Sequence, residues 1–299
     1  MRKLRRIEKN SSYLITKKCN DDLFFLVPHP QANLILMFAM LAFALKYGVE
    51  VHGFCFLSNH FHMVVTDRRA RLPDFMREFL SNSSKALKLL WKEARSVWSS
   101  ARYSAVCLLD VNAAERKLAY TVLNPTRAKL VARPKDWPGL TSAAWQFGDT
   151  MTAKRPAIYF SPETHPEEVS MKLVSVALTF DEPAAASERR IEELVREETQ
   201  AIGRELKAKG ETFAGVAAVL RTSRTKRSTH PVITCNPRFA SKNKKLLEQA
   251  IAEDREFHRK HAVAKAKYLA GDKDVIFPAG TYWYRVFLGV RVERSRKSA

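Results

Sequence analysis

The chain has 299 residues, and its 51 lysine and arginine residues against 31 aspartate and glutamate residues give a net charge of +20 and a pI near 10.0. Hydrophobic residues make up 46% of the sequence, which is ample for a buried core in one large or two ordinary domains. The charge indicates a partner that carries many phosphates but does not exclude a ribosomal protein or a binder of anionic membranes, so the reaction must be argued from motifs.

In chain order, the first half alternates strands and helices. We expect a strand at 12–18, a helix at 31–47, strands at 49–57 and 60–66, a helix at 73–94, a strand at 103–109, and then a helix capped by Asp110 or Asn112. This order predicts an α+β fold with a ferredoxin-like antiparallel sheet on which helices pack. The apolar run at 34–45 is too short to cross a bilayer and ends at Gly48, so we expect a buried core helix and no membrane partner.

The most informative motif is His60-Phe61-His62. Side chains alternate along a strand, so both imidazoles point to one face of the sheet and Phe61 points to the other. Neutral imidazole is the commonest protein ligand for metals, and we interpret the pair as half of a metal site. The alternative is two half-buried structural histidines with backbone partners.

A two-residue turn at 58–59 would orient the neighbouring side chains. His52 would then point away from His60, and we expect it to have a structural role. Cys55 would lie opposite His62, but a lone thiol is more often a core residue than a metal ligand. The four cysteines, at 19, 55, 107 and 235, show no paired metal spacing. No apolar signal segment follows the basic residues 2–6, so we expect a reducing, cytoplasmic location.

The second motif is Tyr120-x-x-x-Asn124-Pro125. Residues four apart on a helix share one face, and Pro125 places Asn124 at or near a helix end or kink. The pair could offer a phenol nucleophile and an amide oxygen to one metal. The alternative is a helix-packing tyrosine and a simple helix end before proline.

Together the two motifs resemble the single-tyrosine HUH transposases, and within them the REP-associated tyrosine transposases. The matching residues are Asn59-His60-Phe61-His62, Tyr120-x-x-x-Asn124-Pro125-x-Arg127-Ala128, and Trp137–Ser142, which resembles the segment that closes this domain. The resemblance covers about residues 10–148, and it departs at Leu57-Ser58, where family members often carry Met-Pro. It implies an HUH fold in which His60 and His62 bind a divalent cation, Asn124 completes the site and Tyr120 attacks DNA.

The chemistry follows from these groups. Mixed nitrogen and oxygen ligation suits Mg²⁺ or Mn²⁺, and a cation on a phosphate oxygen stabilises the charge that develops there. Attack by Tyr120 would give a covalent 5′-phosphotyrosine and a free 3′-hydroxyl, a linkage that another strand can reverse. We therefore expect a metal-dependent endonuclease and strand transferase that acts on single-stranded or hairpin DNA in transposition.

Two alternatives stay open at this point. The chain could be a domesticated nucleic-acid-binding regulator that keeps the fold without cutting, or a phosphodiesterase that uses water in place of Tyr120. The family contains both monomers and dimers, so a homodimer also stays open. Six cations that follow the two motifs are expected to contact phosphates: Arg68, Arg69, Arg71, Arg127, Lys129 and Arg133.

The expected domains are a catalytic unit at 1–150 and a mainly helical extension at 151–299. Within the extension we expect a linker or extended edge at 156–166, helices at 187–209, 212–220 and 242–269, a basic loop at 221–227, and an aromatic segment at 275–284 that packs back. The extension is either a DNA-binding appendage or a helical cover on the catalytic unit.

Overall fold

The computed structural model describes residues 4–228 and 237–294, so Cys235 lies outside the described residues. The first half forms β1 (Ser11–Lys18), α1 (Pro30–Tyr47), β2 (Val49–Leu57), β3 (His60–Asp67), α2 (Leu72–Trp91) and β4 (Ser104–Leu108), with a short 3-10 turn at Asn20–Asp22. The sheet order is β2-β3-β1-β4, and each neighbouring pair is antiparallel. The expected α+β class with a ferredoxin-like sheet is confirmed.

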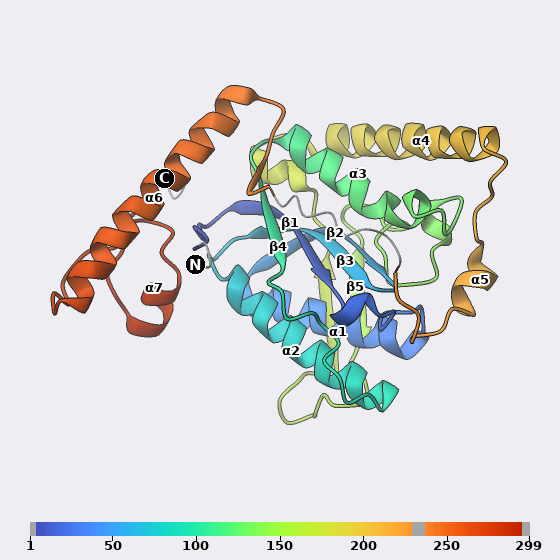
Figure 1. Cartoon of the computed structure of the whole chain (residues 1–299), viewed down its shortest axis with the longest axis horizontal. Helices are drawn as coiled ribbons and strands as arrows, with labels where there is room; N and C mark the ends of the chain where they lie inside the picture. The colour runs from blue at the N-terminus through green and yellow to red at the C-terminus, as the bar shows by residue number, and fades with distance from the viewer. Residues whose placement is uncertain (1–3, 229–236, 295–299) are drawn as a thin grey trace.

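One face of this sheet is covered by α1 and α2 (Figure 1). Strand alternation sends Phe61, Met63 and Val65 to this face, where they join the main hydrophobic core. Most of α1 is buried, and Gly48 ends the helix in the left-handed conformation. Among residues 4–228 and 237–294, α1 alone is long and apolar enough to cross a membrane by length and composition, a test that the core helices of soluble proteins also pass.

The opposite face carries α3 (Val111–Arg127), on which α4 (Ala184–Ala208) lies (Figure 1). Asp110 caps α3 as expected, because its carboxylate accepts the backbone N–H of Ala113 at 2.7 Å. Leu118 of α3 and Ile191 of α4 belong to a second hydrophobic core on this face. The helix runs through Pro125 to Arg127, so Asn124 lies in its last turn, near the helix end that the proline predicts.

The prediction for His52 was wrong in its orientation. The expected two-residue turn is present, since Leu57 pairs with His60, but a bulge between Val51 and Gly53 shifts the register. His52 therefore turns to the α3 face, where Nε2 lies 2.7 Å from Oγ1 of Thr66. Nδ1 lies 2.7 Å from the carbonyl of Val174, and these two bonds give the buried ring the structural role that was expected.

The second half contributes to the main core as well as covering it. β5 (Thr150–Lys154) and β6 (Glu168–Lys172) form a hairpin, and its buried Met151 and Val169 belong to the same core as α1. The stretch at 156–166, expected as a linker or edge, is the loop of this hairpin and contains the buried Phe160. Residues just beyond 150 thus complete the core of the first half, while the domain boundary itself stays a prediction.

Short segments lie along both edges of the sheet. β7 (Phe239–Ala240) pairs in parallel with β4. At the other edge, the backbone N–H of Phe56 donates to the carbonyl of Leu140 at 2.8 Å, and that of Ser142 donates to the carbonyl of Phe54 at 2.9 Å. Residues 137–142, which were expected to close the domain, thus lie along β2, after a 3-10 turn at Pro134–Asp136.

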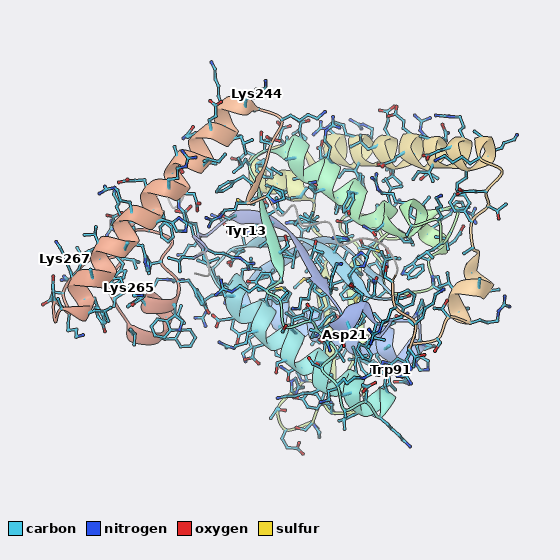
Figure 2. The ribbon with its side chains drawn as sticks, viewed as in Figure 1. Tyr13, Asp21, Trp91, Lys244, Lys265 and Lys267 are labelled. Carbon is cyan, nitrogen blue, oxygen red and sulfur yellow. The ribbon has the colours of Figure 1, made fainter. Side chains whose placement is uncertain are left out.

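The remaining helices continue the chain over the surface. After the 3-10 turn Val176–Phe180 and α4, the short helix α5 (Val216–Leu220) leads into the basic loop, where Arg227 forms an isolated bridge with Leu23. The long helix α6 (Lys244–Leu269) lies beside the sheet, with Lys244 and Lys267 near its two ends (Figure 2), and α7 (Trp283–Leu288) follows it.

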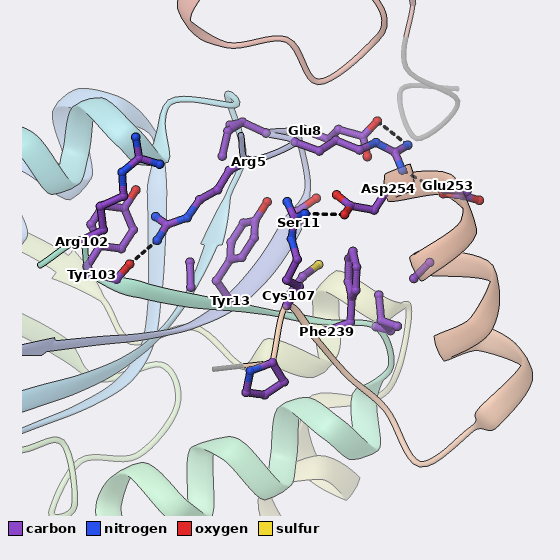
Figure 3. Close-up of a pocket in the computed structure, with 17 residues that line it drawn as sticks. Arg5, Glu8, Ser11, Tyr13, Arg102, Tyr103, Cys107, Phe239, Glu253 and Asp254 are labelled. Atoms are coloured by element: carbon purple, nitrogen blue, oxygen red, sulfur yellow. Dashed lines mark hydrogen bonds and ion pairs between the residues drawn. The ribbon is translucent and has the colours of Figure 1, made fainter. Parts of the chain in front are cut away.

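A cleft of about 350 Å³ lies where α6 meets the sheet (Figure 3). Its floor includes Tyr13 and Cys107, and its walls come from the N-terminal segment, β7 and α6. Arg238 beside β7 pairs with Asp254 of α6 at 2.5 Å, so the cleft marks the contact between the extension and the sheet. Tyr13 belongs to the α1 and α2 face, so this cleft lies across the sheet from His62.

Candidate metal and tyrosine site

The two motif histidines lie at the start of β3, directly after the hairpin turn. Both rings project to the α3 face, and their centroids are 5.0 Å apart. Phe61 between them points to the other face, where it is fully buried and stacks on Phe56 with the ring centroids 4.9 Å apart. Strand geometry therefore fixes the spacing of the two imidazoles, and the Phe61 anchor holds that part of the strand in place.

Each imidazole has one ring nitrogen occupied by a neighbour. Nδ1 of His62 lies 2.7 Å from Oγ1 of Thr16, its cross-strand partner on β1. Nδ1 of His60 lies 2.7 Å from Oδ1 of Asn59 in the hairpin turn. These bonds orient the rings, and at His62 they leave Nε2 as the nitrogen open to a ligand.

The helix α3 brings the second motif to the same place within one chain. The ring of Tyr120 meets that of His62 edge to face, with the centroids 5.2 Å apart. One turn later, the side chain of the buried Asn124 hydrogen bonds to the imidazole of His60. All four residues of the predicted site are thus adjacent in space, although nearly sixty residues separate the two motifs.

Both histidines are held in the neutral form. Burial, together with the nearby ammonium of Lys18, lowers the pKa of His60 to about 4. Burial also places the pKa of His62 well below its ordinary value, with additional lowering from His60 and Lys117. Neutral imidazole is the form that binds metal ions, so the site needs no proton release at physiological pH before binding.

Two cations flank Tyr120 from its own helix. The ammonium of Lys117 lies 5.6 Å from the centroid of the Tyr120 ring, and the guanidinium of Arg127 lies 5.3 Å from it. Arg127 also forms an ion pair with Glu198 of α4. The phenol is therefore surrounded by positive charge, a suitable environment for a phosphate that approaches it.

The six predicted phosphate contacts are not all near this site. Only Arg127 touches Tyr120. Arg68, Arg69 and Arg71 follow the far end of β3, about 25 Å from His60 at the usual rise per strand residue. Five of the six form ion pairs: Arg68 with Glu50, Arg71 with Asp74, Arg127 with Glu198, Lys129 with Glu211, and Arg133 with Asp136.

The sequence motifs missed several neighbours of the site. Thr16 and Lys18 of β1 pair across the sheet with His62 and His60, and this becomes visible only once the register of β1 on β3 is known. Lys117 stands one turn before Tyr120 on the same helix, so the same spacing rule could have identified it. No sequence signal connects Glu198 to Arg127.

The donor set fits a hard or borderline divalent cation. Two neutral imidazoles and one carboxamide oxygen converge from β3 and α3. Across residues 4–228 and 237–294, no group of three or more His, Cys, Asp or Glu side chains is placed to hold a metal ion. The site at His60 and His62 differs from such a group, because its third ligand would be the carboxamide of Asn124.

No family model and no curated protein matches the chain. Among solved structures, it is similar to a REP-associated tyrosine transposase bound to a REP hairpin, with 17% identity and a TM-score of 0.40 over 48% of this chain and 82% of that one. It is also similar to a Deinococcus radiodurans protein provisionally described as a transposase, with 14% identity and a TM-score of 0.28 over 36% and 85%. At these values, function must be argued from the chain's own residues.

Proposed function

We propose that this chain is a metal-dependent single-stranded DNA endonuclease and strand transferase that acts in transposition through a 5′-phosphotyrosine linkage. The observation that carries the proposal is the 5.2 Å contact between the Tyr120 and His62 rings, with His60 and Asn124 beside them. A tyrosine that only packed the helix would have no need of two neutral imidazoles and a carboxamide around it.

His60, His62 and Asn124 would hold Mg²⁺ or Mn²⁺, which when bound neutralises the developing charge on a phosphate oxygen. Thr16 and Asn59 keep the two imidazoles oriented. Lys117 and Arg127 attract the DNA phosphate to the phenol of Tyr120.

The covalent step is a transesterification. The Tyr120 oxygen bonds to phosphorus, the bond from phosphorus to the 3′ oxygen breaks, and the departing 3′ oxygen gains a proton as the phenol loses one. The energy of the phosphodiester is kept in the tyrosine linkage. Attack by a 3′-hydroxyl from another strand then releases Tyr120 and joins the DNA without ATP.

The test is to trap the adduct. The full chain is incubated with labelled single-stranded DNA that contains hairpins and with Mn²⁺, and then denatured and analysed for label on the protein. We expect an adduct that disappears with EDTA and in Tyr120→Phe but persists in Tyr159→Phe, a matched control whose hydroxyl bonds to Asn82 away from the site.

The same experiment separates the alternatives. Cleavage that survives Tyr120→Phe would favour a phosphodiesterase that uses water. Binding that is insensitive to EDTA, with no cleavage across a broad hairpin library, would favour a DNA-binding regulator. Either result would overturn the proposal.

A further inference from the structure

The helix α7 is held rigidly against α6 by an aromatic cluster. The ring of Tyr284 stacks on the fully buried Phe277, with the centroids 4.6 Å apart and the planes at 24°. The same tyrosine meets His261 and Tyr268 of α6 edge to face, at 5.7 and 5.6 Å. One face of α7 is therefore fixed, and the orientation of its other face is fixed with it.

The catalytic half of the chain also anchors this helix. The guanidinium of Arg285 donates to the carbonyl of Ala70 at 2.8 Å, and the Tyr282 side chain hydrogen bonds to Asp74 in the first turn of α2. Farther along α6, Nε2 of His258 lies 3.1 Å from the carbonyl of Leu4. The α6 and α7 segment thus has a defined position at the end of the sheet opposite His60.

The outer face of α7 exposes large apolar side chains. Trp283 and Phe287 are each 50% exposed, and the adjacent Leu288 is 44% exposed. The Trp283 and Phe287 rings lie 5.9 Å apart with their planes at 30°. We call these three residues the aromatic platform; two aromatic rings exposed together on a rigid base indicate a binding surface.

The charge around the platform favours an anionic occupant. Residues 258–291 carry seven lysine or arginine residues and two aspartates, and because Arg259 and Arg291 form ion pairs, the charge left for a ligand comes mainly from lysines. Lys265 and Lys267 lie near the end of α6 beside which α7 packs (Figure 2). A second copy of the chain would bring the same positive charge to the contact and be repelled, whereas a polyanion would be attracted.

We propose that the aromatic platform binds single-stranded DNA, with bases stacked on Trp283 and Phe287 and phosphates held by the surrounding lysines. Stacking on exposed aromatic rings beside cations is the usual mode for sequence-independent binding of single strands. The assignment rests on the proposed function in taking DNA as the substrate.

The test uses the full chain with Tyr120→Phe, so that binding is measured without cleavage. Fluorescence anisotropy with a labelled oligothymidylate of about 20 nucleotides gives the affinity at fixed salt. Trp283→Leu and Phe287→Leu keep an apolar side chain but remove the ring, whereas Trp283→Tyr and Phe287→Tyr keep a ring. Leu89→Ala is the control, because Leu89 is 56% exposed beside Lys88 on α2.

We expect each leucine variant to bind about fivefold to tenfold more weakly, and each tyrosine variant and the control to stay within about twofold of the parent. Leucine variants that bind like the parent would overturn the proposal. So would leucine variants that bind oligothymidylate like the parent but lose the parent's binding to phosphatidylglycerol vesicles, or that turn a parent dimer into a monomer in sedimentation velocity. These results would assign the platform to a lipid surface or to a second copy.

Failure of the platform proposal can be distinguished from failure of the proposed transferase function. The leucine variants in a background with Tyr120 intact are assayed for the covalent adduct. Normal adduct formation with unchanged oligothymidylate binding would refute the platform alone. If the leucine variants bind oligothymidylate more weakly but the parent chain with Tyr120 never forms the adduct, the transferase function alone would be refuted.

Discussion

Gly53→Ala is expected to destabilise the chain by disturbing the contact between β2 and the helix that carries Tyr120. A Cβ at Gly53 would lie 2.3 Å from Cδ1 of Leu118 and 3.2 Å from Oγ of Ser142. Leu118 is 3% exposed, so its side chain must leave its packed position for the adjoining cavity, or else α3 or its core neighbours must shift. Overpacking a core by one methyl group costs about 1–3 kcal/mol.

The partner substitution Leu118→Ala removes the group that the new methyl would strike. Alone, it should cost about 2–5 kcal/mol through the cavity that it leaves. In the double variant the alanine methyl at position 53 occupies part of that cavity. We therefore expect the double loss to be smaller than the sum of the single losses by about 1–2 kcal/mol.

The assay is urea unfolding followed by circular dichroism, with the free energy of unfolding extrapolated to water. Gly203→Ala is the control, because nothing lies within 4 Å of its Cβ on α4 and alanine favours a helix by up to about 1 kcal/mol. Adduct formation by Gly53→Ala should also fall, because Tyr120 stands two residues after Leu118. Strict additivity in the double variant, or a Gly53→Ala chain as stable as the parent, would refute this reasoning.

Two other predictions concern the pH dependence of stability and the cations near the site. Burial lowers the pKa of His52 to about 4, so the folded state resists protonation of this ring, whereas the unfolded chain takes up the proton near pH 6.5. The free energy of unfolding should therefore fall as the pH drops from about 6.5 towards 4, by about 2 kcal/mol at pH 5. His52→Gln should flatten the plot of unfolding free energy against pH between pH 6.5 and 4. An equally steep plot for the parent and the variant would contradict the role given to His52. Lys117→Gln should slow adduct formation about tenfold in a quenched time course, because Lys117 lies beside Tyr120. Arg68→Gln, at the far end of β3, should slow it less than twofold. Equal effects of the two substitutions would mean that both residues act only by attracting DNA in general.

The fold of the first half could be predicted because its signals are local. Apolar runs of the right length, the Asp110 cap and the turn before His60 each specify one element, and their order specifies the ferredoxin-like sheet. The proximity of His60 to His62 follows from strand alternation, and that of Tyr120 to Asn124 from helix periodicity.

Other features depend on pairings that no local pattern encodes. The bulge at His52 inserts one residue into β2 and reverses the side chain. Gly53 beside it is a local signal, since an isolated glycine in a strand often marks a bulge, but it does not specify which side chain is reversed. The partners of Arg127 and Lys129 are acids in the second half, Glu198 and Glu211, so their charges could be counted but not located. The hairpin of β5 and β6 was missed because its strands have only five residues each and enclose a proline-containing loop.

The two covered edges of the sheet restrict how copies of this chain could assemble. Residues 238–240 use the outward N–H groups of Cys107 and Leu109, and residues 140–142 use the outward groups of Phe54 and Phe56. A neighbouring molecule therefore finds those backbone donors and acceptors already occupied and cannot extend the sheet there by strand addition. A homodimer that extended this sheet would first have to displace those segments, whereas Tyr120 already lies beside His62 within one chain.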